Sequence, residues 1–177
     1  NCNMKDAIEC FADHIVETNF SDIPDRAIHS AKTFILDTLG VGLAGSTGPY
    51  VEELLNAYSS ASPAELTSRV LGQRARINSA DAALINGFQI HNSEFDCVHE
   101  EAVIHTMTVL LAVLLADADR RGKINGIELL KSAILGVDVA CNLGVACTSG
   151  LQFFRPATAG AFAGVAAVGS VRGYDKE

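Results

Sequence analysis

Residues 91–105, HNSEFDCVHEEAVIH, contain three histidines, four acidic residues and one cysteine in fifteen positions. Imidazole, carboxylate and thiol groups are the side chains that bind metal ions, act as nucleophiles and transfer protons near neutral pH. Four interpretations are therefore open for this segment: a zinc site, a thiolate nucleophile, an acid/base pocket and an ordinary polar loop.

A zinc site would require His91, His99 and His105 to converge on one ion. Their spacings of eight and six residues do not place them on one helix face, so a loop would have to fold around the metal. The pair His99-Glu100 also lacks the second histidine of an HExxH motif, because position 103 is Val. The spacing disfavours zinc, and we expect no metal ion.

A thiolate nucleophile would be Cys97, which lies two residues before His99. Residues two apart rarely face each other on a regular element. A free cysteine is more often a small buried apolar side chain than a reactive group. The spacing therefore disfavours this interpretation as well.

Acid/base chemistry would use Glu94, Asp96 and His105, because the two carboxylates follow a predicted helix and the histidine opens an apolar segment. A histidine near a carboxylate, partly desolvated by apolar helices, can transfer protons near neutral pH. Glu100 and Glu101 are expected to be solvated and to favour the start of the next helix. For Asp96 and His105 the residues alone leave a catalytic and a structural role equally open.

A motif that could bind anions surrounds Arg155. Arg155 precedes Pro156 and Thr158, which predict a helix N-terminus where anions bind, although a surface arginine is an equal alternative.

Residues 40–45, GVGLAG, match the GxGxxG pattern of dinucleotide-binding sites. Such a site needs a strand before the glycines and a helix after them. A helical period precedes this motif and a turn follows it, so we expect the glycines to allow close packing at a helix end.

The elements that position these residues are predicted to be helices. Apolar residues recur at helical spacing through most of the chain, which predicts a single all-α domain over residues 1–177, a bundle of about seven helices. Residues 103–118 are apolar on nearly all sides and predict one buried central helix. Residues 59–79 lack a helical period and are expected to form mostly loop, with a short strand within 66–71.

The composition limits the partners of this domain. The 177 residues are 49% apolar with a net charge of −8, which disfavours nucleic acid and anionic membrane surfaces as partners. The longest apolar run, residues 107–116, is too short to span a bilayer. Neither a CxxC pair nor a signal peptide is apparent, so we expect reduced thiols and a cytoplasmic location.

Four segments, in this order, resemble the MmgE/PrpD family, which includes 2-methylcitrate dehydratase, cis-aconitate decarboxylase and iminodisuccinate epimerase. They are FILDTLGVGLAGS, ALINGFQIHNSEFDCVHEEAVIHTMTV, GKINGIELLKSAILGVDVACNLG and FFRPATAGAFAGVAAV. The resemblance implies a helical domain that pairs with a smaller α/β lid domain, with the active site between them. It also implies chemistry without metal or organic cofactor on small di- and tricarboxylates. A proton next to a carboxylate is moved, and water is lost, CO₂ is lost or the centre is inverted.

The resemblance also assigns the residues. The family's acidic motif falls on residues 94–97 and its following histidine on His105, so Glu94, Asp96 and His105 are the predicted catalytic residues. His99, Arg155 and Thr158 are the predicted substrate-binding residues. The chain departs from the family pattern in three ways: Glu94 and Cys97 stand at aspartate positions, Thr106 replaces proline, and Arg155 stands where many members carry histidine.

The sequence therefore predicts a cofactor-independent lyase of the 2-methylcitrate dehydratase type that acts on a small polycarboxylate. An epimerase of the same family and a non-catalytic helical module for dimerisation or binding are the alternatives. Since 177 residues are well under half of a typical member, we expect the lid domain to be lacking. The apolar helix faces that a lid would cover then predict a homo-oligomer.

Overall fold

The computed structural model describes residues 6–59, 68–74, 76–148 and 154–176, and within them seven α-helices dominate, as the sequence predicted. The helices are α1 (Ala7–Glu17), α2 (Asp25–Gly45), α3 (Val51–Ser59), α4 (Ser79–His91), α5 (Thr106–Arg121), α6 (Gly126–Ala146) and α7 (Arg155–Arg172). A 3₁₀ turn, η1 (Phe20–Asp22), precedes α2. The short strands β1 (Ser68–Arg69) and β2 (Arg76–Ile77) form an antiparallel pair within the predicted loop region.

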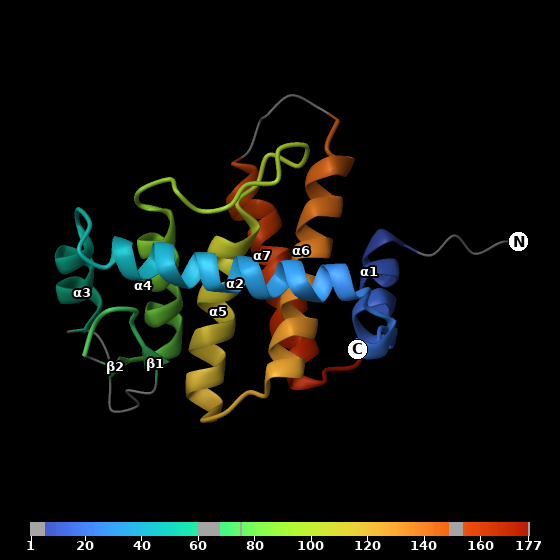
Figure 1. Cartoon of the computed structure of the whole chain (residues 1–177), viewed down its shortest axis with the longest axis horizontal. Coiled ribbons are helices and arrows are strands. Elements are labelled where there is room, and N and C mark those ends of the chain that lie inside the picture. The colour runs from blue at the N-terminus through green and yellow to red at the C-terminus, as the bar shows by residue number, and fades with distance from the viewer. Residues whose placement is uncertain (1–5, 60–67, 75, 149–153, 177) are drawn as a thin grey trace, which may run out of the picture.

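Helix α5 is the centre of the bundle. It packs against α4, α6 and α7, and α2 lies across this group (Figure 1). Nine of its sixteen residues are buried, and its core side chains are Met107, Leu110, Leu111 and Leu114. Each fully buried leucine contributes about 1.5–3 kcal/mol relative to exposure, so this stripe is a main source of stability. The prediction of a buried central helix is confirmed.

Polar residues set the starts of α2 and α4. Helix α2 begins at Asp25 after Pro24, and Ser21 and Asp22 belong to the preceding 3₁₀ turn. The N-cap of α4 is Asn78, whose side chain accepts a hydrogen bond from the Asp81 amide. Neighbouring polar residues can each act as the N-cap, and the spacing of the apolar residues does not determine which of them does.

The GVGLAG motif is the C-terminal end of α2, and its glycines allow close packing, as expected. A Cβ at Gly45 would lie 1.9 Å from the carbonyl oxygen of Gln89, and one at Gly42 would lie 2.9 Å from the Ile90 side chain. Both contacts are with the last turns of α4. The motif therefore holds the end of α4, which carries His91, against α2.

Within the described residues, α6 alone has the length and apolar composition that a membrane span requires. A core helix of a soluble protein has the same properties. Helix α6 packs against α7, α5 and α2 and begins with an Asn125–Glu128 capping box. These contacts bury part of its apolar surface, while Ile127 and Val145 are exposed.

Candidate active site

The segment between α4 and α5 carries the candidate site. The His99 amide donates to the carbonyl of Ile104 at 2.9 Å, and the two residues form an isolated antiparallel bridge. Ala102 and Ile104 are buried in a small apolar cluster with side chains of α6 and α7. This anchored loop places His105 as the N-cap residue of α5, while His91 stands in the last turn of α4.

Asp96 is the centre of the site. Its side chain is 0% exposed, and His91 Nδ1 lies 3.1 Å from each of its carboxylate oxygens. His105 Nδ1 lies 3.2 Å from Oδ2 and 3.3 Å from the Asp96 carbonyl oxygen. The Thr108 hydroxyl donates to Oδ2. A buried carboxylate is costly unless it is hydrogen-bonded, and here two imidazoles and a hydroxyl provide the partners.

The two histidines meet at the carboxylate from opposite helix ends. Their ring centroids are 4.9 Å apart in an edge-to-face arrangement with an interplanar angle of 66°. The His91 side chain is 35% exposed and the His105 side chain 24%, so both rings reach solvent while Asp96 does not. Two solvent-accessible imidazoles joined to one buried carboxylate form a site that can transfer protons.

The same three residues could hold a divalent ion, because one donor atom from each lies within 4.8 Å of the others. Two imidazoles and one carboxylate are a donor set that suits zinc or iron. This set differs from the three-histidine zinc site considered for the sequence, because it contains Asp96 and not His99. In the structure the two Nδ1 atoms contact the Asp96 carboxylate directly, and a metal-free site remains our prediction.

The other predicted site residues lie apart from this cluster. Glu94 is exposed and adopts a left-handed backbone with φ +51°. His99 accepts from the Ala102 amide through Nδ1 at 3.1 Å and lines a cavity of about 400 Å³ between α2 and α6. Arg155 donates to the carbonyl of Cys147 at 3.0 Å, and Thr158 donates to the carbonyl of Phe154 at 3.3 Å. Their predicted roles remain predictions, and of the six residues the structure joins only Asp96 and His105.

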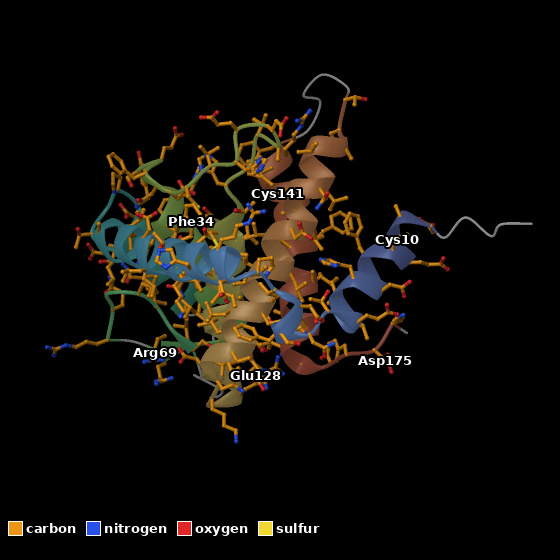
Figure 2. All side chains as sticks on the ribbon, turned by 45° about the vertical axis from the view of Figure 1, so that its right-hand side comes forward. Cys10, Phe34, Arg69, Glu128, Cys141 and Asp175 are labelled. Carbon is orange, nitrogen blue, oxygen red and sulfur yellow. The ribbon has the colours of Figure 1, made fainter. Side chains whose placement is uncertain are left out.

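Cys97 lines the same cavity as His99, together with Cys141 and Phe34. Burial raises the pKa of the Cys97 thiol and raises that of Cys141 to about 11. Figure 2 shows Cys141 and Phe34 on α6 and α2, and Cys10 on α1 away from them. A raised pKa leaves the thiol protonated at neutral pH, which further disfavours the nucleophile interpretation of Cys97.

Two residues of the cluster were missed from the sequence. His91 was considered only as a zinc ligand, and Thr108 was counted within an apolar helix. Thr108 follows His105, the N-cap residue of α5, by three residues. Side chains at this spacing lie close together on a helix, so the sequence could have indicated that both contact the same group. The contact of His91 with Asp96 depends on the turn at residues 92–95. The sequence pattern does not predict the path of such an irregular turn.

Comparison with known proteins identifies the family of the chain. The sequence profile of the MmgE/PrpD N-terminal domain matches residues 9–177. The chain is 34% identical over 140 residues to a cis-aconitate decarboxylase of Homo sapiens, a match that covers 77% of the chain and 29% of that protein. It is 31% identical over 138 residues to a cis-aconitate decarboxylase-like protein of Aspergillus oryzae, which covers 75% of the chain and 28% of the relative.

A cis-aconitate decarboxylase of Aspergillus terreus is 30% identical over 129 residues, or 71% of the chain and 26% of that protein. The matched part of the chain thus spans less than a third of the length of these relatives. The profile match covers nearly the whole chain and includes every residue of the Asp96 cluster. The chain therefore belongs to the MmgE/PrpD family, and its residues 9–177 correspond to the N-terminal domain of that family.

Proposed function

We propose that the protein is a lyase of small di- or tricarboxylates that transfers a proton at the carbon next to a carboxylate. The observation that carries the proposal is the buried Asp96 carboxylate joined to His105, whose ring is partly exposed. Asp96 orients the imidazole through Nδ1, and His105 carries the proton on Nε2, the ring nitrogen turned away from the carboxylate. This division follows from exposure, because a side chain that is 0% exposed does not meet a substrate directly.

The position of His105 supports its role as the proton carrier. It is the N-cap residue of α5, its Nδ1 lies 3.2 Å from Asp96 Oδ2, and its side chain is 24% exposed. Nε2 can therefore accept the proton in a dehydration, or in its protonated form donate a proton to the carbanion that loss of CO₂ leaves. The net charge of −8 means that an anionic substrate must be held by local cations, and Arg155 and the histidines are candidates on this chain.

The same proton transfer is compatible with three products. Removal of the proton followed by loss of hydroxide gives dehydration, and return of the proton to the other face gives epimerisation. Loss of CO₂ from an unsaturated tricarboxylate leaves an electron pair on the carbon beside another carboxylate, which must then be protonated. The named relatives are decarboxylases or decarboxylase-like. They favour decarboxylation of a cis-aconitate-like acid over the dehydration of 2-methylcitrate that the sequence suggested first.

The test uses the protein encoded by the complete reading frame, incubated in D₂O with cis-aconitate or 2-methylcitrate and followed by ¹H NMR. With cis-aconitate we expect loss of CO₂ and a product with deuterium at the carbon next to a carboxylate. With 2-methylcitrate, dehydration removes the hydrogen at that carbon, so exchange would be seen as deuterium in the remaining substrate. Asp96→Asn and His105→Gln should reduce the rate by roughly 10²–10⁴, the range for loss of general acid/base catalysis. Asp25→Asn, an exposed aspartate on α2, is the matched control and should leave the rate unchanged.

Excess chelator is present in a parallel sample, because His91, Asp96 and His105 could hold an ion. Exchange that persists with chelator supports cofactor-free chemistry. If wild-type protein catalyses neither turnover nor C–H exchange with these acids, the lyase proposal is wrong and the non-catalytic helical module is favoured.

Exposed apolar side chains also favour self-association. On α7, Phe162 is 51% exposed and Val165 is 74% exposed, and on α2 Leu36 is 73% exposed. Large apolar side chains exposed in this way are typical of association surfaces when they are contiguous. We propose a homo-oligomer, and static light scattering at micromolar concentration tests it. A monomer under those conditions would contradict the proposal.

A further inference from the structure

We propose that His91 is a positioning residue: it holds the Asp96 carboxylate in the orientation that fixes the His105 ring and leaves its Nε2 available for proton transfer. The expected effect on the reaction rate rests on the proposed function. The expected effect on the His105 tautomer does not, because it is measured by NMR without substrate. Neither the sequence motifs nor the names of the relatives assign a role to this residue.

The hydrogen bonds of the carboxylate are divided unevenly between its oxygens. Oδ2 receives the Thr108 hydroxyl and lies 3.2 Å from His105 Nδ1. The contact described for Oδ1 is that with His91 Nδ1, at 3.1 Å. Because the carboxylate is 0% exposed, solvent does not replace a lost partner. Removal of the His91 donor would therefore leave a buried carboxylate oxygen without its hydrogen bond, which is strongly unfavourable.

His91 is itself fixed by its helix. It ends α4, whose last turns are held against α2 by the close contact of Gly45 with the Gln89 carbonyl. Its ring lines a shallow groove between α4 and α5 together with apolar side chains such as Leu84, Phe88 and Val109. Most of the residues that line this groove are apolar, and the contact described for Nδ1 is with the Asp96 carboxylate.

The two histidines contact the carboxylate differently. His91 Nδ1 lies 3.1 Å from both Oδ1 and Oδ2, whereas the carboxylate contact of His105 Nδ1 is with Oδ2, at 3.2 Å. The histidine that contacts both oxygens fixes the plane of the carboxylate. This geometry assigns the holding role to His91 and the proton-carrying role to His105.

The consequence concerns the tautomer of His105. With Oδ2 fixed, the His105 proton stays on Nδ1 and the lone pair stays on Nε2. Without His91 the carboxylate can rotate toward another donor, and the His105 ring loses its fixed acceptor. A smaller fraction of the enzyme would then present a basic Nε2, which lowers kcat more than it raises KM.

The test compares His91→Asn with His91→Leu, which have nearly the same shape. The asparagine amide nitrogen occupies the position of the imidazole Nδ1 and can donate to Asp96, whereas leucine cannot. Two quantities are measured on the full protein: the rate of C–H exchange, and the ¹⁵N resonances of His105, which separate protonated from unprotonated ring nitrogens. Circular dichroism melting shows whether each variant is folded, and His91→Phe replaces the leucine variant if that one does not fold.

We expect the leucine variant to lose roughly 10- to 100-fold in kcat, as for other residues that orient a reactive group, and to show mixed His105 tautomers. The asparagine variant should retain most of the rate and the Nδ1-protonated tautomer. Equal rates and unchanged tautomers in both variants would overturn the proposal, as would equal losses in both variants with the His105 tautomer unchanged. If wild-type protein shows no exchange at all, the proposed function fails but the tautomer comparison still decides the role of His91.

Discussion

Gly144 of α6 lies directly against Ala102 in the loop that carries the site. A Cβ at Gly144 would lie 2.6 Å from the Ala102 Cβ and 2.8 Å from its carbonyl oxygen. Ala102 is 0% exposed and belongs to the loop bridged by His99 and Ile104. The absence of a side chain at Gly144 therefore lets this loop rest on α6, and the position of His105 depends on that contact.

Gly144→Ala should destabilise the protein although alanine favours helix. Overpacking against backbone costs about 1–3 kcal/mol, and the better helix propensity of alanine returns up to about 1 kcal/mol. The free energy of unfolding from urea titration should fall, and the exchange rate should fall with it as the loop shifts. Gly40→Ala is the control, because a Cβ there meets nothing within 4 Å. That variant should be neutral or slightly stabilising, and equal effects at both positions would contradict the prediction.

Thr108→Val should destabilise the protein and slow the reaction. Valine keeps the shape of threonine but removes the hydroxyl that donates to the buried Asp96 carboxylate. The loss of one such partner costs about 1–3 kcal/mol. Thr108→Ser keeps the donor and should retain most of the stability and rate. Denaturation and NMR exchange of both variants check this, and a valine variant as stable and active as the serine variant would speak against a role for the hydroxyl.

The thiols should differ in their reactivity with iodoacetamide at pH 8. Cys10 and Cys147 are exposed, whereas Cys97 and Cys141 are partly buried and have raised pKa values. A rise from 9.0 to about 11 reduces the thiolate fraction of Cys141 roughly 100-fold. Peptide mapping by mass spectrometry should find Cys10 and Cys147 labelled first. Early labelling of Cys141 in folded protein would contradict its burial.

The raised pKa of Cys141 also predicts the direction of a pH effect on stability. The folded state favours the protonated thiol, so this contribution is fully present below pH 9 and is lost as pH rises through about 11. The unfolding free energy of wild-type protein should therefore fall over this range more than that of Cys141→Ala. Parallel pH profiles of the two proteins would show that the thiol does not contribute.

Arg155→Met should lower the melting temperature. The Arg155 guanidinium donates to the carbonyl of Cys147 at 3.0 Å and lies 3.5 Å from that of Gly144, so it caps the C-terminal end of α6 from the start of α7. Hydrogen bonds from a charged donor contribute about 1.5–3 kcal/mol, less when they are exposed. Thermal unfolding and KM are measured together. A higher KM with an unchanged melting temperature would instead favour the substrate-binding role that the sequence suggested.

The fold was largely predictable because helix formation here follows from local periodicity. The apolar residues of 103–118 predicted a buried helix, and α5 (Thr106–Arg121) is the centre of the bundle. The glycines of GVGLAG predicted close packing, and Gly45 meets the Gln89 carbonyl of α4. A period of 3.6 residues places side chains on a face without any knowledge of the partner.

The site was only partly predictable. Asp96 and His105 could be singled out because a carboxylate and an imidazole adjoin an apolar segment, and the structure joins them. Glu94 was a close further candidate, yet it is exposed while Asp96, two residues later, is buried. The path of an irregular turn decides which carboxylate faces inward, and no sequence period describes that path.

The sequence by itself determined the helices, the buried centre and the concentration of imidazole and carboxylate groups in residues 91–105. Only the tertiary structure decided that His91 and Thr108 complete the cluster while His99 lines a different cavity. The three partners of Asp96 (His91, His105 and Thr108) come from the ends of α4 and α5, and a loop resting on Gly144 brings them together. Helices follow from contacts between near neighbours, whereas this site depends on the packing of α4, α5 and α6, which no local pattern encodes.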